Sequence, residues 1–216
     1  MVLDVGCGTG IAARQFREAG CSVLGVDVDA RMAAVARGRG FAVEVGRFEE
    51  WDPAGRTFDA VVAGQTWHWV DPVAGAAKAA TVLRPGGRLA LFWNVFQAPP
   101  ALAEALGAVY RRVLPGLPAA NLSDALAAYG SMVVSATDGM AQAGGFGPAE
   151  EWRFEWDRTY GRDEWLDQIP THGGVNRLPP ATLQDLLAGV GAAIDAAGGN
   201  VPVHYTTVAV TAVRED

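Results

Sequence analysis

The chain has 216 residues, half of them hydrophobic, which is enough for one large domain with a sizeable core. Its formal net charge of −7 disfavours polyanionic partners, so we expect neither nucleic acid nor a membrane to bind it. Two cysteines, and no apolar run near the ~20 residues of a membrane span, predict a cytoplasmic protein without a disulfide framework or metal site. A small molecule is the expected partner, and the oligomeric state stays open.

The first 96 residues alternate short apolar runs with helical patterns. The runs that predict buried strands lie at residues 2–6, 22–29, 41–46, 58–65 and 88–96. Helical spacing of apolar residues occurs at residues 10–20, 30–40 and 71–83, and Pro and Gly predict a turn at 84–87. Such a βαβ series requires a parallel sheet with helices on both faces, so the expected fold class is α/β.

The second half of the chain is less regular. Its helical patterns lie at residues 100–114, 123–145, 162–169 and 180–199. Two segments alternate or are rich in β-branched residues, and they predict strands at 151–160 and 203–213.

Three glycines follow the first predicted strand in the stretch MVLDVGCGTG, at Gly6, Gly8 and Gly10. This turn lies at the carboxyl edge of a parallel sheet, where ligands bind, and glycine lets a ligand approach the backbone closely. Gly8, Gly10 and Ala13 also satisfy the relaxed dinucleotide fingerprint. An NAD(P)-binding Rossmann oxidoreductase therefore remains an alternative, as does a non-catalytic nucleotide-binding module.

Two acids stand beside the predicted glycine loop. Asp4 lies two residues before the first glycine, where its charge would repel a pyrophosphate and favour a cationic sulfonium compound. Its structural alternative is the satisfaction of loop amides. Asp27 ends the second strand, near the offset of about 20 residues at which an acid takes ribose hydroxyls. Its alternative role is to cap the following helix.

Four stretches occur in the order LDVGCGTG, GVDVDARM, FDAVVAGQTWHWV and LRPGGRLALFWN. Together they resemble the class I S-adenosylmethionine-dependent methyltransferases, especially small-molecule enzymes similar to trans-aconitate methyltransferase. The resemblance covers the first half of the chain. It implies a Rossmann-like sheet of seven strands in the order 3-2-1-4-5-7-6, with the last strand antiparallel. It also implies a single domain over residues 1–216, with a cofactor-binding half at 1–96 and an acceptor-binding half at 97–216.

The resemblance implies S-adenosyl-L-methionine as the cofactor and assigns it a set of contacts. These are Asp4, Gly6, Cys7, Gly8, Gly10, Asp27, Val28, Met32, Phe48, Glu49, Gly64 and Gln65. Taken alone, Cys7 indicates packing within the loop. Arg47 stands where such enzymes often carry an acidic or polar adenine contact, so Glu49 is the expected replacement. Family members usually carry further helices before the first strand, and their absence from this sequence predicts a more exposed cofactor cleft.

Aromatic residues follow the fourth predicted strand. The rings of Trp67 and Trp69 would attract a sulfonium and shape an acceptor slot, and His68 is the candidate general base. The alternative is core or surface packing for the two tryptophans and a hydrogen-bonded loop histidine for His68. Asn94 and His172 complete the predicted acceptor contacts. The predicted reaction is methyl transfer to a small organic molecule. If that acceptor were a carboxylate, it would instead need a cation such as Arg153, Arg158, Arg162 or Arg177.

Overall fold

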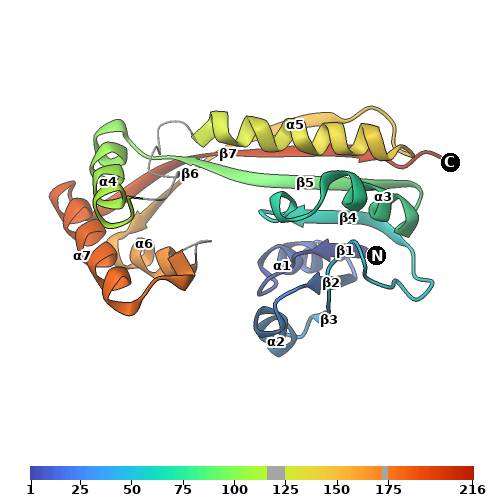
Figure 1. Cartoon of the computed structure of the whole chain (residues 1–216), viewed down its shortest axis with the longest axis horizontal. Coiled ribbons are helices and arrows are strands. Elements are labelled where there is room, and N and C mark those ends of the chain that lie inside the picture. Colours follow the sequence, from blue (N-terminus) through green and yellow to red (C-terminus); the bar gives the residue numbers. More distant parts are fainter. Residues whose placement is uncertain (116–124, 172–174) are drawn as a thin grey trace. The chain divides into compact units, whose positions relative to one another are not determined.

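The computed structural model describes residues 1–115, 125–171 and 175–216 (Figure 1). Its chain forms two compact units. The first unit comprises Met1–Asn94, Tyr129–Arg153 and Thr207–Asp216, and the second comprises Val95–Ala128 and Phe154–Thr206. The first boundary between the units follows Asn94, close to the predicted boundary between residues 96 and 97. Two later segments return to the first unit, so no single cut in the sequence separates the units.

Seven strands form one sheet in the order β3-β2-β1-β4-β5-β7-β6, as the sequence predicts. Their bounds are β1 Val2–Val5, β2 Val23–Asp27, β3 Ala42–Val45, β4 Phe58–Gly64, β5 Leu83–Gln97, β6 Glu150–Gly161 and β7 Asn200–Val213. Strand β1 pairs in parallel with β2 and β4. Strand β7 runs antiparallel to β5, because Arg214 bonds to Gly87 whereas the earlier residue Thr207 bonds to the later residue Asn94. The antiparallel last strand is thereby confirmed.

Seven α-helices lie in the described part of the chain. They are α1 Ile11–Glu18, α2 Ala30–Gly38, α3 Pro72–Val82, α4 Pro100–Val113, α5 Ala125–Ala143, α6 Arg162–Gln168 and α7 Pro180–Ala196. The start of α3 shows how local sequence sets these bounds. Asp71 accepts hydrogen bonds from the amides of Val73 and Ala74, and Pro72 occupies the first turn, where no amide is needed. None of the described helices has the length and apolar character needed to cross a membrane.

The first unit buries two apolar clusters. The smaller cluster joins α1 and α2 to the sheet through Cys7, Ala13, Ala33, Ala36, Phe41 and Val43. The larger cluster combines the strands with α3 and α5, and its fully buried members include Leu3, Phe58, Leu89, Trp93 and Met140. The parallel strands are buried on both faces, and their sequences accordingly read as nearly continuous apolar runs.

The turn predicted at residues 84–87 is part of β5 in the structure. The pairing of β4 with β5 moves from Phe58↔Leu83 to Ala60↔Arg88, so β5 carries extra residues there. Gly86 has a φ of 75°, a conformation that glycine adopts without strain. The Pro and Gly residues therefore build an irregularity inside a long strand rather than a separate turn.

The second unit has its own core, built from α4, α6, α7 and the adjoining ends of β6 and β7. Leu186, Val190 and Ile194 of α7 are fully buried in it. Its buried polar groups are paired, since the hydroxyls of Tyr160 and Tyr205 lie 2.8 Å apart. The core contributes packing to this unit.

Candidate functional site

The glycine loop connects β1 to α1, and its backbone requires glycine. Gly6, Gly8 and Gly10 have φ values of 65°, 53° and 84°, which side chains of L-residues disfavour. At Gly6 space is also lacking, because an added Cβ would lie 2.0 Å from the Thr66 side chain. At Gly10 an added Cβ would lie 2.9 Å from the ring of Phe41. Gly8 faces open space.

Asp27, at the end of β2, ties the glycine loop to the next loop. Its carboxylate accepts hydrogen bonds from the amides of Gly8, at 2.7 Å, and Asp29, at 2.8 Å. The cap of α2 is supplied by Asp29 instead, whose side chain accepts from the amide of Arg31. Asp27 is thus free of the capping role and lies at the junction of two loops.

Asp4 is a buried carboxyl behind the same loop. Its side chain is 1% exposed, and the Oδ2 atom has no hydrogen-bond partner among the described residues. Burial raises its pKa to about 7, an effect that the amide of Ala13 opposes and the charge of Asp27 reinforces. The carboxyl therefore satisfies one loop amide and also keeps an unpaired oxygen. Such an oxygen is stabilised by a nearby cation.

Cys7 is buried and packs against the sheet, where a Cβ at Gly25 would lie 2.5 Å from its Sγ. Burial, and then the charge of Asp4, raise the pKa of this thiol to about 12, so it stays protonated and unreactive. This placement agrees with a packing role inside the loop.

A pocket of about 260 Å³ opens beside Gly6 and Asp27. It lies at the carboxyl ends of β1 and β2, and all its lining residues belong to the first unit. The lining residues are Val5, Gly6, Val26, Asp27, Val28, Gly46, Arg47, Phe48, Glu49, Thr66, Trp69 and Val70. Sites for drug-sized ligands measure about 300–1,000 Å³, and this pocket lies just below that range.

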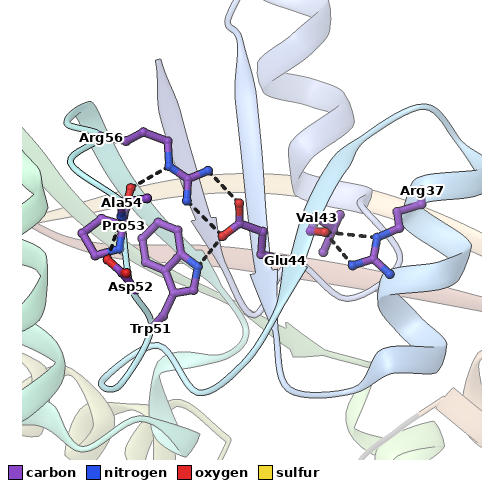
Figure 2. Close-up of polar contacts among 8 residues, drawn as sticks. All are labelled: Arg37, Val43, Glu44, Trp51, Asp52, Pro53, Ala54 and Arg56. Carbon is purple, nitrogen blue, oxygen red and sulfur yellow. Dashed lines mark hydrogen bonds and ion pairs between the residues drawn. The ribbon is translucent and has the colours of Figure 1, made fainter.

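A polar network on either side of residues 46–49, which form one wall of the pocket, is shown in Figure 2. Glu44 accepts two hydrogen bonds from Arg56, at 2.6 and 3.0 Å, and one from the indole of Trp51, at 2.6 Å. Arg37 of α2 donates to the carbonyl of Val43. The pairing with Arg56 lowers the pKa of Glu44, so its carboxylate stays charged at neutral pH.

Glu49 connects this wall to the start of α3. Its carboxylate accepts from the amide of Asp71 at 3.1 Å and lies 3.6 Å from the guanidinium of Arg47. Arg47 also lines the pocket, so the local charge of Glu49 is partly compensated. The ring of Phe48 is 3% exposed and packs beside Trp67, with ring centroids 6.2 Å apart.

The structure brings some of the sequence-predicted residues together at the pocket and leaves others apart. The lining set contains Gly6, Asp27, Val28, Phe48, Glu49 and Trp69. The loop-shaping set consists of Asp4, Cys7, Gly8 and Gly10. Residues outside the pocket lining are Met32, Gly64, Gln65, Trp67, His68 and Asn94. His172 falls outside the described residues.

Trp67 differs most from its prediction. It begins a short 3-10 helix, η1 (Trp67–Trp69), and is 3% exposed within the larger core cluster. An added Cβ at Gly75 of α3 would lie 3.1 Å from its ring, so the indole packs against that helix instead of forming an open slot. The next aromatic, Trp69, is 75% exposed and does line the pocket.

His68 lies in η1, and Asn94 lies within β5. The imidazole is on the surface, with its ring centroid 5.1 Å from that of Trp69, and partial desolvation lowers its pKa. The Asn94 side chain accepts a hydrogen bond from Thr207 at 2.8 Å. Its backbone carbonyl accepts from the side chain of Gln65, whose φ is 57°.

Thr66 is a site residue that sequence reasoning missed. Its hydroxyl lies 3.1 Å from the carbonyl oxygens of both Gly6 and Gly64, either of which can accept its proton, and so it joins the ends of β1 and β4. The only signal in the sequence was that Thr66 lies between two predicted site residues, Gln65 and Trp67. Only the approach of the two loops shows that it lines the pocket.

Comparison with known proteins gives a consistent assignment. A family model described as a methyltransferase domain matches residues 3–91. An uncharacterised methyltransferase of Mycobacterium tuberculosis is 38% identical over 113 residues, covering 51% of this chain and 46% of that protein. Demethylmenaquinone methyltransferase of Tropheryma whipplei is 35% identical over 143 residues, covering 63% and 59%. The chain spans about half the length of the curated relatives it matches.

A solved structure supports the fold over a longer stretch. A putative type II methyltransferase from Anaeromyxobacter dehalogenans has a TM-score of 0.61 and 24% identity, covering 97% of this chain and 88% of that one. At this identity the likeness concerns the fold. Over residues 3–91 the chain matches the methyltransferase-domain family, and the strand order and the glycine loop agree with the fold of the class I S-adenosylmethionine-dependent methyltransferases.

Proposed function

We propose that this chain binds S-adenosyl-L-methionine in the pocket beside Gly6 and Asp27 and transfers its methyl group to a small organic acceptor. The observation that carries the proposal is a pocket of about 260 Å³ next to a glycine loop that is backed by two acids, Asp4 and Asp27. When bound, this cofactor supplies an electrophilic methyl group on a positively charged sulfur.

Asp27 would hold the ribose hydroxyls of the cofactor. Two of its lone pairs already accept amides of the surrounding loops, which fixes the carboxylate at the pocket wall, and its remaining lone pairs are available to a ligand. Val28 and Phe48 supply apolar surface for the adenine, and Glu49 lies on the same wall as the candidate polar contact. These roles are proposed from the lining of the pocket.

Asp4 would favour the cationic end of the cofactor. A carboxyl with a pKa near 7 is about half ionised at neutral pH, and a nearby positive charge stabilises its ionised form. A pyrophosphate would have the opposite effect. The charge of this loop therefore favours a sulfonium nucleoside over NAD(P).

On the acceptor side, Trp69, His68 and Asn94 are the proposed contacts. Trp69 lines the pocket with an exposed ring that would attract a sulfonium by cation–π interaction. His68 has a lowered pKa, so it is neutral at pH 7 and able to accept a proton. Trp67 supports this region from the core. His172 stays a prediction made from the sequence alone.

Methyl transfer to a lone pair of the acceptor requires no covalent intermediate with the protein. The residues above would align the acceptor with the methyl group and exclude water, which is worth several orders of magnitude in rate. His68 would act only where the acceptor must lose a proton. Three of the four arginines considered for a carboxylate acceptor have acidic partners, since Arg153 pairs with Glu151, Arg158 with Glu164 and Arg162 with Asp163. Their charges are therefore partly compensated already.

Calorimetry with S-adenosylhomocysteine and with NAD on the full chain tests the cofactor. We expect binding of the former alone, because the pocket is small and acidic. Tight uptake of NAD without S-adenosylhomocysteine would overturn the assignment and favour the oxidoreductase alternative.

A turnover assay with labelled cofactor and a panel of hydroxyl, amine and carboxylate acceptors tests the reaction. We expect transfer to one class of acceptor, with a lower rate in His68→Gln if a proton must leave. Binding of the cofactor without transfer to any member would favour the non-catalytic module.

A further inference from the structure

A second hollow lies on the other side of the glycine loop, between α1 and α2. It measures about 680 Å³ and shares no lining residue with the cofactor pocket. We call it the arginine pocket and define it by Thr9, Gly10, Ile11, Arg14, Arg17, Arg39 and Phe41. All of these residues belong to the first unit.

Three guanidinium groups and no carboxylate line the arginine pocket. This contrasts with the whole chain, in which 24 acids outnumber 17 lysines and arginines. Arg14 and Arg17 are three residues apart on α1, so their like charges face the same side of the helix and repel each other. The unbalanced charge is therefore concentrated in one place.

The arginines of this pocket are positioned without acidic partners. Arg17 donates to the carbonyl of Arg39 at 3.3 Å, and its guanidinium lies 4.1 Å from the centroid of the Phe41 ring. Arg39 donates to the carbonyl of Thr9 at 2.9 Å. Within the described part of the chain, neither Arg17 nor Arg39 has a carboxylate at ion-pair distance. Arg14 has only Glu18, at 3.9 Å, and both side chains are well exposed.

These arginines keep donors that no internal acid uses. A guanidinium carries five N–H donors in a planar fork, and the contacts above engage one donor of Arg17 and one of Arg39. Phosphate oxygens match this fork in bidentate geometry. Ile11 is 64% exposed at the rim and offers apolar surface beside the charges.

We propose that the arginine pocket binds the phosphate group of an organic phosphate. Arg17 and Arg39 hold the phosphate, Arg14 adds long-range attraction, and Ile11 contacts the organic part. Bound phosphate removes the repulsion between the arginines of α1. The site is separate from the cofactor pocket, and its existence does not depend on methyl transfer.

Calorimetry on the full chain at constant ionic strength, with inorganic phosphate, inorganic pyrophosphate and phenyl phosphate as probes, tests the proposal. We expect phenyl phosphate to bind more tightly than inorganic phosphate, and phenol not to bind. In Arg17→Gln and Arg39→Gln, affinity for phenyl phosphate and pyrophosphate should fall about tenfold each, the equivalent of one lost charge-assisted contact. Arg153→Gln removes the same charge from β6 and should leave affinity within about twofold of the wild type. Circular dichroism checks that each variant is folded.

Saturation with S-adenosylhomocysteine separates this site from the cofactor pocket. We expect the bound nucleoside to leave pyrophosphate and phenyl phosphate affinity unchanged. Displacement of either probe by S-adenosylhomocysteine, or an affinity equal to that of the wild type in Arg17→Gln and Arg39→Gln, would overturn the proposal. Equal affinity for inorganic phosphate and phenyl phosphate would contradict the part of the proposal that assigns an organic group to the ligand. Tighter binding of a single-stranded RNA than of every small probe would assign the arginines to a nucleic acid backbone instead.

Discussion

The two units of this molecule treat buried polar groups differently. Within the described residues, three buried side-chain atoms lack a hydrogen-bond partner: Asp4 Oδ2, Trp67 Nε1 and Trp93 Nε1. All three belong to the first unit, whereas the buried tyrosine hydroxyls of the second unit are paired with each other. Unpaired buried groups cost stability, and the one beside the glycine loop, Asp4 Oδ2, indicates a unit shaped for a ligand. The second unit is organised as an apolar core.

The largest expected effect concerns Asp4 and pH. Its folded-state pKa of about 7 exceeds the usual 3.8, so the folded chain holds this proton more tightly than the unfolded chain. This group's contribution to stability is therefore full below about pH 4 and is lost as pH rises through about 7. The shift corresponds to at most about 4 kcal/mol. Between pH 4 and 7, the free energy of unfolding measured with urea should fall more steeply with rising pH in the wild type than in Asp4→Asn. Parallel curves would contradict the assigned pKa.

A core substitution in the second unit should lower the free energy of unfolding without changing ligand affinity. Leu186 is fully buried on α7, and Leu186→Ala should lower the free energy of unfolding by about 3 kcal/mol. The affinity of the folded protein for S-adenosylhomocysteine should stay within about twofold. Urea unfolding and calorimetry measure the two quantities. The exposed neighbour provides a control, since Gln184→Ala should change neither quantity. A large loss of affinity in Leu186→Ala would mean that the core of the second unit also determines ligand binding.

Asp27→Asn tests the ligand-shaped unit directly. The variant keeps the side-chain shape but loses the charge that the two loop amides and the proposed ribose contacts share. We expect S-adenosylhomocysteine affinity to fall about 100-fold, from several weakened charge-assisted hydrogen bonds. Asp185→Asn on α7 removes the same charge in the second unit and should have no such effect. Unchanged affinity in Asp27→Asn would argue against this pocket as the cofactor site.

The smallest effect is expected at the wall drawn in Figure 2. Glu44→Gln keeps the position but weakens the bonds to Arg56 and Trp51, which fix residues 46–49. Because Glu44 is 40% exposed, we expect about 1 kcal/mol, measured as a few-fold loss of S-adenosylhomocysteine affinity. Glu104→Gln, which breaks an exposed pair with Arg111, is the matched control. Equal affinities in both variants would mean that the network does not position the wall.

The sequence alone determined the glycine loop and the alternation of strands and helices in the first half of the chain, and its resemblance to a known family implied the strand order. The first two features are local or periodic, because apolar runs mark buried strands and Gly6, Gly8 and Gly10 stand where positive φ values are needed. The acid at the end of β2 was found in the same way, because its spacing from the loop is set by one βα unit. The irregularity at residues 84–87 was misjudged because Pro and Gly signal a break without telling whether the strand continues.

Only the tertiary structure decided which aromatic side chains are available to a ligand and which groups meet across loops. Trp67 and Trp69 are two residues apart in one short helix, yet one is buried and the other is 75% exposed. Thr66 joins the ends of β1 and β4, and three arginines from α1 and the end of α2 line one hollow. Such placements depend on how nonadjacent elements pack, because contacts between distant segments leave no periodic mark in the sequence.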